Sequence, residues 1–372
     1  MPTPDTKLQH QVQSAIDDFV ASNVERALQV AVYQQGELVV DAVAGLADPT
    51  LRRPMFSDTP VFSYSIGKGM AATAAHVLAE RGVLSYDTPI VELWPEFGAH
   101  DKEKATVRHA LSQSLGTPYL PPGLTVDDLC DWDKMTAIVA DAKLEWEPGT
   151  KIGYHAVTWG YIVGEIVRRA SGKPIAQVLY DEIATPLGVA DELFFAIPKD
   201  DQGRLAVLED APVSEEMAAY MDQMPADSPF FKLGPAEATT AAFGNNPAVR
   251  SATIPAGGTV TARAVARMYA ALLGEVDGVR LISPERLREV SAVAASGEDA
   301  VFGFPTAWGL GYSLGQSMAN AAETQHIFGV GGVGGSIANA DTKSGVVFAL
   351  TKNRLAADFD TADKVGAIVS AG

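Results

Sequence analysis

The sequence predicts an α+β fold in which one sheet takes strands from both ends of the chain and a mostly helical region lies between them. A hairpin pattern near the N-terminus and several strand patterns after Trp308 indicate the sheet. Helical patterns dominate the middle of the chain. We therefore expect residues 1–70 and 251–372 to form a sheet domain and residues 71–250 a mostly helical domain, with an active site at their junction.

The first element is a hairpin over residues 27–44. Apolar residues alternate on both sides of Gln35-Gly36, which favours two antiparallel strands joined by a glycine turn. Helices follow at residues 65–81, which end before Gly82, and at 157–170 and 261–273, each with apolar residues at three- to four-residue spacing. The segment 206–250 is rich in Pro, Asp, Gly and Asn. It is predicted to be a long irregular excursion that could line a pocket.

The C-terminal part of the chain returns to strand patterns. These cover residues 308–314, 326–328, 336–339 and 345–351, with a glycine-rich turn between the second and the third. A helix over residues 359–369 closes the chain.

Composition excludes several classes of function. With 372 residues, 47% of them hydrophobic, the chain can bury a large core, and no stretch has the apolar length of a membrane span. A net charge of −18 opposes binding to nucleic acid or to anionic membranes, so neither is an expected partner. The N-terminal segment lacks the pattern of a secretory signal, and the single cysteine, Cys130, excludes an internal disulfide. We expect a cytoplasmic protein, and the sequence leaves its oligomeric state open.

The segment Ser65-Ile66-Gly67-Lys68 is the only S-x-x-K motif in the chain. Because Ser65 stands where a helix begins, Lys68 shares its face, with about 5–6 Å between the Cβ atoms. Free N–H groups and the positive dipole end of the helix would favour an oxyanion beside Ser65. The alternative interpretation is an N-cap serine followed by a solvated lysine.

Tyr154 stands at the end of a turn-rich loop, residues 146–155, that leads into a helix. A phenol, whose ordinary pKa is near 10, can activate a serine if a nearby cation lowers its pKa, and Lys68 could do so. Alternatively, a desolvated Lys68 is itself the base. The sequence leaves both assignments open. A loop tyrosine bonded to backbone is the alternative without chemistry.

The glycine-rich stretch 329–336 satisfies G-x-G-x-x-G, but a strand follows it and the chain soon ends. A dinucleotide site would instead open a helix in a βαβ unit, so we reject that interpretation. The glycines would rather allow the backbone to approach a bound acyl group and to present an N–H to its carbonyl oxygen. No G-x-S-x-G motif is present, which disfavours the α/β-hydrolase fold. The scattered histidines form no ligand-spaced pair, so we expect neither a metal nor an organic cofactor.

In this order and spacing, the motifs resemble the superfamily of serine β-lactamases and penicillin-binding proteins, and most closely class C β-lactamases and family VIII carboxylesterases. Residues 105–118 and 255–263 are similar to the family's "TVRHLLTHTSGLP" and "GGLYSTARDLARF" stretches. The resemblance covers nearly the whole chain. It implies a β-lactamase/transpeptidase-like fold, with an antiparallel sheet flanked by helices plus a mostly helical domain.

The resemblance also implies roles for individual residues. Ser65 would be the acylated nucleophile, Lys68 and Tyr154 the pair that handles its proton, and the N–H groups of Ser65 and Val333 the oxyanion hole. The substrate-binding positions would be Val330, Gly331, Gly332, Gln113 and His155.

Two motifs depart from the family pattern. The family's Y-x-N is here Tyr154-His155-Ala156, and its K-T-G, or the H-G-G of its esterases, is Val330-Gly331-Gly332. Both changes remove polar groups that bind the amide and the carboxylate of a β-lactam.

We therefore expect a serine carboxylesterase that acts on small, largely apolar esters through an acyl-Ser65 intermediate, with a small-molecule ester as its partner. One alternative is an acyltransferase of the same fold, and another is an amide hydrolase such as a D-aminopeptidase or a weak β-lactamase. A binding protein without turnover is a third. Intact Ser65, Lys68 and Tyr154 argue against it.

Overall fold

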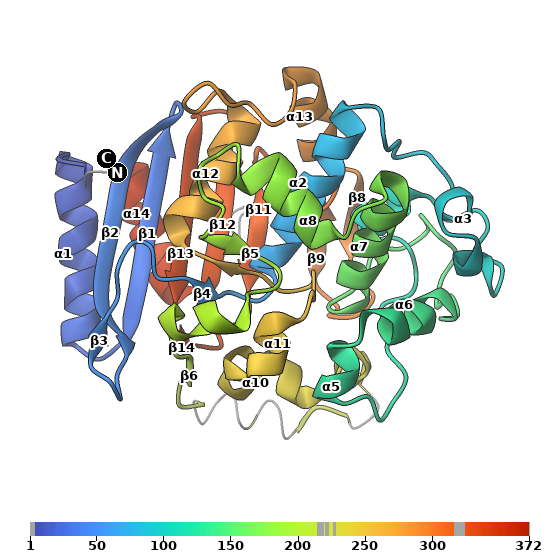
Figure 1. The fold of residues 1–372 in the computed structure, drawn as a ribbon, viewed down its shortest axis with the longest axis horizontal. Helices are drawn as coiled ribbons and strands as arrows, with labels where there is room; N and C mark the ends of the chain where they lie inside the picture. The colour runs from blue at the N-terminus through green and yellow to red at the C-terminus, as the bar shows by residue number, and fades with distance from the viewer. Residues whose placement is uncertain (1–3, 214–218, 220–222, 226–227, 316–323, 372) are drawn as a thin grey trace.

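The computed structural model describes residues 4–213, 219, 223–225, 228–315 and 324–371. Within these residues the central feature is a nine-stranded sheet in which every neighbouring pair is antiparallel (Figure 1). Its order is β3-β2-β1-β13-β12-β11-β10-β9-β8. The strands are β1 (Ala27–Gln34), β2 (Glu37–Asp48), β3 (Arg53–Pro54), β8 (Ala295–Glu298), β9 (Pro305–Trp308), β10 (Ser313–Leu314), β11 (Ile327–Gly332), β12 (Ser336–Asp341) and β13 (Val346–Lys352).

The pairing of β1 with β13 joins the two ends of the chain, and Ala31 lies opposite Ala349. The predicted sheet built from both ends is therefore confirmed. The predicted hairpin is confirmed as well. Gln35 and Gly36 both have positive φ, 51° and 86°, the turn geometry that matches the twist of two antiparallel strands.

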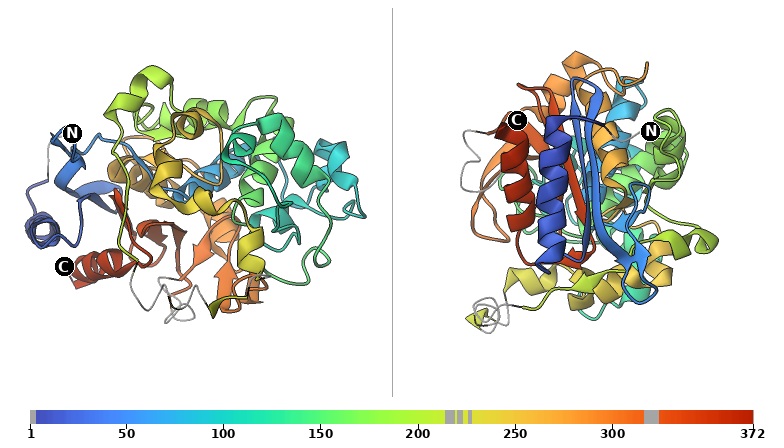
Figure 2. Two further views of the ribbon diagram at one scale, coloured as in Figure 1. Left: turned by 90° about the horizontal axis from the view of Figure 1, so that it is seen from below. Right: turned by 90° about the vertical axis from the view of Figure 1, so that its left-hand side faces the viewer.

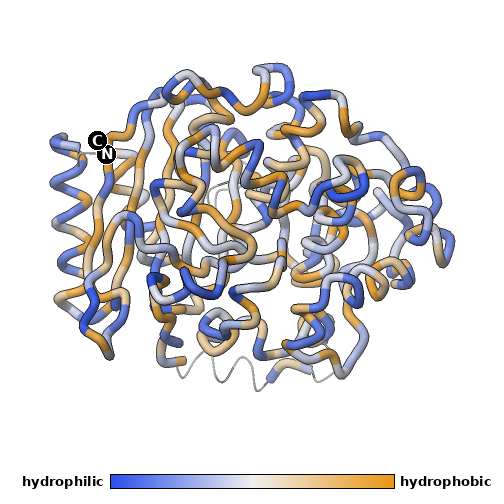
Figure 3. Tube along the Cα trace, viewed as in Figure 1, coloured by the Kyte–Doolittle hydropathy of each residue, from blue (hydrophilic) through white to orange (hydrophobic). Residues whose placement is uncertain are grey.

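Helices cover both faces of the sheet. On one face lie α1 (Lys7–Ala21) and α14 (Asp360–Ala371), side by side in Figure 2. On the other face lie α12 (Ala262–Leu273) and α2 (Ile66–Glu80). Because both faces are covered, β1 is buried along nearly its whole length, and Figure 3 shows hydrophobic stretches along the central strands.

A mostly helical region lies beside this sheet. Its longest helix is α7 (Thr158–Ser171), which ends at Gly172 in a left-handed conformation, as the sequence predicts. The other helices are α3 (Ile90–Leu93), α4 (Val107–Leu111), α5 (Val126–Leu129), α6 (Trp132–Ala140), α8 (Ile175–Leu179), α10 (Ala241–Asn245), α11 (Pro247–Ser251) and α13 (Pro284–Ser291). One hydrophobic core continues from the sheet through α2 to α7. The division after residues 70 and 250 stays a prediction.

Short strands complete the fold. β7 (Thr259–Val260) pairs with β4 (Val61–Phe62) and with β5 (Leu193–Phe194), and β14 (Arg354–Leu355) pairs with β6 (Glu209–Asp210). In the three-stranded sheet β4-β7-β5, the pairing of β4 with β7 holds the segment before α2 against the segment before α12. This pairing fixes the position at which α2 begins. None of the helices in the described ranges combines the length and the apolar character needed to cross a membrane.

Two sequence predictions for the C-terminal strands are corrected. The predicted strand 308–314 is a hairpin of β9 and β10, with Ser313 opposite Trp308, because Gly311 turns the chain at a φ of 83°. The predicted glycine turn is shorter than expected, since β11 continues through Gly332 and the turn spans only residues 333–335. Gly329 is required inside this strand, because a Cβ there would lie 2.2 Å from the Ala338 carbonyl oxygen.

Candidate active site

The start of α2 brings Ser65 and Lys68 together. Ser65 directly precedes the helix, and its side chain makes no capping hydrogen bond. The Lys68 Nζ donates to Ser65 Oγ at 3.1 Å, and the lysine is fully buried. The interpretation as an N-cap serine and a solvated lysine is therefore wrong. The helix can lie this deep because Gly67 lacks a Cβ, which would fall 2.2 Å from the Gly257 backbone.

Neutral oxygens surround the Lys68 amine. Besides Ser65 Oγ, its Nζ donates to the carbonyls of Ala156 at 2.7 Å and Ala256 at 3.4 Å. It also lies 4.9 Å from the centroid of the Tyr154 ring. The two carbonyls hold the amine in place, and its third hydrogen bond is directed at Ser65 Oγ.

Tyr154 contacts the same serine. Its hydroxyl donates to Ser65 Oγ at 2.8 Å. The ring of Tyr154 packs against Phe302 and Trp308, with centroid separations of 5.7 and 5.9 Å. Tyr154 is thus no solitary loop tyrosine bonded to backbone. Two groups able to accept and return a proton lie within hydrogen-bond reach of one hydroxyl, the arrangement needed to activate a nucleophile.

The end of β11 lies directly against Ser65. A Cβ at Gly332 would lie 2.1 Å from the Ser63 carbonyl oxygen and 3.4 Å from the Ser65 nitrogen. Val333 follows at the start of the turn, and its side chain is exposed. In the described part of the chain, neither the Ser65 N–H nor the Val333 N–H donates to a protein acceptor. Both can therefore serve an incoming oxygen.

Gln113 and His155 lie behind the site. The His155 ring is buried, with Nδ1 2.7 Å from the Gly153 carbonyl and Nε2 accepting the Thr117 N–H at 3.0 Å. Burial lowers the pKa of His155 to about 4, so the ring is neutral near pH 7. The Gln113 Oε1 accepts the His155 N–H at 2.8 Å, and this side chain is also buried.

The expectation that Gln113 and His155 contact a substrate stays a prediction. The His155 ring and the Gln113 Oε1 atom bond to backbone groups and so support the loop that carries Tyr154. The Gln113 Nε2 atom is buried and has no hydrogen-bond partner among the described residues.

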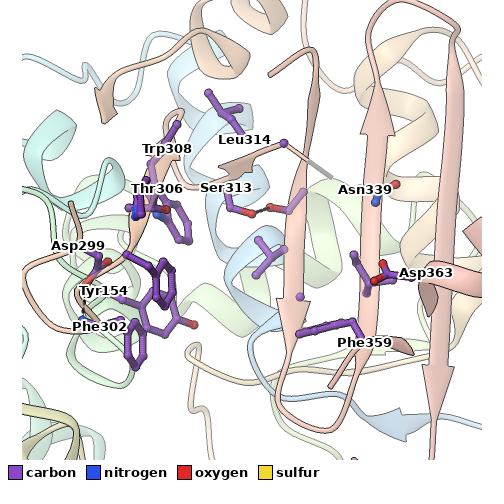
Figure 4. A pocket seen from close by; sticks show the side chains of 18 residues that line it. Tyr154, Asp299, Phe302, Thr306, Trp308, Ser313, Leu314, Asn339, Phe359 and Asp363 are labelled. Atoms are coloured by element: carbon purple, nitrogen blue, oxygen red, sulfur yellow. Dashed lines mark hydrogen bonds between the residues drawn. The ribbon is translucent and has the colours of Figure 1, made fainter. Parts of the chain in front are cut away.

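A cleft of about 520 Å³ opens beside Tyr154 (Figure 4). One wall is aromatic, and β11 supplies Val330 and Gly331. Of the predicted substrate-binding positions, these two line the cleft, and Gly332 lies against Ser65. The aromatic wall consists of Tyr154, Phe302, Phe304 and Trp308.

The opposite side of the cleft is formed by β12 and the start of α14, with Ile337, Asn339, Phe359 and Asp363. The Phe359 ring covers Gly331, where a Cβ would lie 2.8 Å from the ring. The described residues of the segment 206–250 do not line this cleft. Its Phe230 lies behind the wall, with its ring centroid 6.4 Å from that of Phe302.

Two carboxylates belong to the cleft. Asp299 is 2% exposed, and its Oδ1 accepts the N–H groups of Val301 at 2.9 Å and Phe302 at 3.0 Å. Burial raises the pKa of Asp299, and hydrogen bonds from backbone N–H groups, including that of Tyr154, oppose this rise. Burial together with the neighbouring Asp360 and Asp358 raises the pKa of Asp363.

Five residues that line the cleft were not predicted from the sequence: Asp299, Phe302, Phe304, Phe359 and Asp363. A short segment with two phenylalanines before a strand was the available signal, but nothing in it indicates which loop faces the serine. In the described ranges, no group of three or more His, Cys, Asp or Glu side chains is arranged to hold a metal ion.

Comparisons with known proteins show what this chain is similar to. A family model described as Beta-lactamase matches residues 12–371. The Esterase/beta-lactamase LipL of Mycobacterium tuberculosis (strain H37Rv) is 33% identical over 348 residues, which cover 91% of this chain and 79% of the relative. A solved family VIII carboxylesterase is similar with a TM-score of 0.87 and 29% identity, over 100% of this chain and 99% of the other. A penicillin-binding protein homologue from Caulobacter crescentus has a TM-score of 0.85 and 28% identity, again over 100% of this chain and 99% of the other.

Proposed function

Because the chain belongs to the β-lactamase family, and is a serine hydrolase of the β-lactamase-like type, we propose that it is a carboxylesterase acting on small, largely apolar esters. The observation that carries this proposal is the position of Ser65 Oγ, which receives hydrogen bonds from Lys68 and Tyr154. The aromatic cleft begins at the same tyrosine.

In the proposed reaction, Ser65 Oγ attacks the ester carbonyl carbon and its proton passes to Lys68 or Tyr154. The carbonyl oxygen becomes an oxyanion that accepts from the N–H groups of Ser65 and Val333. The C–O bond to the alcohol then breaks, and the alcohol leaves with the proton. Water attacks the acyl-Ser65 ester in the second half of the cycle, and the same groups return the proton to Ser65.

The residues around the cleft favour esters over β-lactams. Val330 and Ala156 have no polar side-chain atom for a carboxylate or an amide. A buried polar atom left without a partner costs about 1–3 kcal/mol. A short ester carries neither group, so it avoids both penalties.

A weak β-lactamase activity is the second candidate, favoured by one observation: the 33% identical relative is named Esterase/beta-lactamase LipL, for both activities. We also propose that the protein is cytoplasmic, which its single cysteine fits. On account of its net charge of −18, we propose that it binds neither nucleic acid nor membranes.

Covalent labelling tests the proposed function. A fluorophosphonate should add one mass adduct to the protein, and peptide mapping should place it on Ser65. Ser65→Ala should abolish both the adduct and the hydrolysis of p-nitrophenyl butyrate, whereas Ser14→Ala, at an exposed serine of α1, should change neither. An adduct retained in Ser65→Ala would move the nucleophile to another residue.

A further inference from the structure

The cleft beside Tyr154 has aromatic and negatively charged walls. Asp299 lies at the aromatic wall, and Asp363 faces the cleft from α14 on the other side (Figure 4). Among the described residues that line the cleft, neither lysine nor arginine occurs.

Two of the lysines nearest the cleft, Lys68 and Lys352, are paired with other groups. Lys68 is held by Ser65 Oγ and two carbonyls. Lys352, at the end of β13, forms a buried ion pair with Glu25, with 2.5 Å between Nζ and Oε1. Lys364 follows Asp363 on α14 but does not line the cleft. The charge of the Asp363 carboxylate is thus not neutralised by a hydrogen-bonded cation inside the cleft.

The aromatic wall is arranged as a continuous surface. Tyr154 lies 5.7 Å from Phe302 and 5.9 Å from Trp308, and Phe302 is stacked on Phe304 at 5.5 Å. The faces of aromatic rings attract cations, most strongly where water is partly excluded. A carboxylate opposite such a wall adds direct Coulomb attraction, which grows as the local dielectric constant falls.

We propose that this cleft selects esters that carry a positively charged group, such as a quaternary ammonium, and disfavours anionic esters, with Asp363 as a specificity-determining residue. This inference rests on the proposed esterase function and names its substrate class. A volume of about 520 Å³ is large enough for an alkyl chain that ends in a trimethylammonium group. The overall charge of −18 would attract the same substrates from solution.

Pairs of esters that differ only in charge test the proposal. Acetylcholine and 3,3-dimethylbutyl acetate have the same shape and place a charged or a neutral group on the alcohol side. The p-nitrophenyl esters of 4-(trimethylammonio)butyric acid and 5,5-dimethylhexanoic acid do the same on the acyl side. For at least one pair, the wild-type kcat/KM of the cationic ester should exceed that of the neutral ester by about 5-fold.

The ratio of cationic to neutral kcat/KM, measured within each variant, isolates the contribution of charge. Asp363→Asn should bring the ratio close to 1, whereas Asp133→Asn, which removes an exposed charge from the distant α6, should leave it unchanged. The wild-type ratio should also fall with added salt, because salt screens a partly exposed charge. A wild-type ratio of 1 or less for both pairs, or a high ratio that survives in Asp363→Asn, would overturn the proposal.

The proposed function and the charge preference fail in different ways. If the neutral esters are hydrolysed and the ratio is 1, the esterase stands and the charge preference is wrong. If no ester is hydrolysed, the esterase proposal is wrong, and calorimetric titration of Ser65→Ala with acetylcholine and 3,3-dimethylbutyl acetate tests the charge preference by binding. Equal affinities in that titration would overturn it, and affinity for the cation that Asp363→Asn removes would support it.

Discussion

The Tyr154 hydroxyl donates a hydrogen bond to Ser65 Oγ at 2.8 Å, although 89 positions separate the two residues in the chain. Lys68, which is only three positions from Ser65, reaches the same oxygen at 3.1 Å. One contact comes from a helix and the other depends on tertiary structure.

We expect Tyr154→Phe and Lys68→Ala each to lower kcat for p-nitrophenyl butyrate by at least about 10²-fold, the usual effect of losing an acid–base group. Tyr154→Phe keeps the ring packed on Phe302 and Trp308, so circular dichroism should be unchanged. Tyr119→Phe, at another tyrosine, serves as the matched control. Near-normal turnover in either site variant would remove that residue from the mechanism.

Asp299 should act as a positioning residue, because its carboxylate accepts backbone N–H groups of the loop that holds Phe302 against Tyr154. Asp299→Ala leaves those N–H groups without an acceptor, at a cost of about 1–3 kcal/mol in the free energy of unfolding. Stability is measured by urea titration, and the rate of fluorophosphonate labelling of Ser65 reports on Tyr154. We expect both to decrease, with Asp299→Asn retaining part of each. A loss of stability with normal labelling would leave Asp299 a purely structural role.

The preference for esters over lactams follows from Val330 and Ala156. We expect kcat/KM for p-nitrophenyl acetate or butyrate to exceed that for nitrocefin by at least about 10²-fold, since two missing contacts cost about 1–3 kcal/mol each. Val330→Lys combined with Ala156→Asn should narrow the gap, provided that the cleft accepts the larger side chains. Comparable kcat/KM values for ester and lactam in the wild-type enzyme would contradict the esterase assignment and favour a β-lactamase.

Stability should decline with acid because His155 is buried as a neutral ring. Its pKa is about 4 in the folded protein and about 6.5 in the unfolded chain, so the unfolded chain binds the proton first as the pH falls. The contribution is fully present above pH 6.5 and is lost between pH 6.5 and 4, to a total of about 3 kcal/mol. Urea titrations across this range should show the free energy of unfolding falling as the pH falls. A slope that remains the same in His155→Gln would contradict the assignment, and His10→Gln, at an exposed histidine, is the control.

The buried ion pair of Glu25 and Lys352 should stabilise the turn that carries Val333. A Cβ at Gly335, in that turn, would lie 3.5 Å from Lys352 Nζ. Lys352→Met leaves the Glu25 charge buried without its partner, which typically costs about 3–5 kcal/mol. Arg288→Met removes an exposed ion pair and should cost less than about 1 kcal/mol. Thermal unfolding of both variants would contradict the prediction if the two losses were equal.

Local spacing explains which parts of the site could be predicted from the sequence. The pairing of Ser65 with Lys68 follows from helical geometry, and the hairpin turn at Gln35-Gly36 follows from the left-handed backbone that it requires. Such features depend on a few neighbouring residues, so the sequence contains all the information needed to infer them.

Other features depend on contacts between distant segments. The sequence does not reveal that Phe359 covers Gly331, or that the Asp299 loop packs on Tyr154. It also does not reveal that Gln113 and His155 are buried, because the sequence pattern of a polar residue near a motif is the same whether its side chain points inward or outward. Only the tertiary arrangement decides that orientation.

The sheet joins the two ends of the chain, and this has a consequence for synthesis. Ser65 and its helix leave the ribosome well before β11 and Val333, which lie more than 260 positions later in the chain, and β13 must then insert between β12 and β1. Contacts between residues as distant as Ala31 and Ala349 form slowly, because a long loop must close first. A nascent chain stalled before β11 would therefore carry the proposed nucleophile without the proposed oxyanion-hole N–H of Val333, and we expect activity only after β11 to β13 have been made and paired.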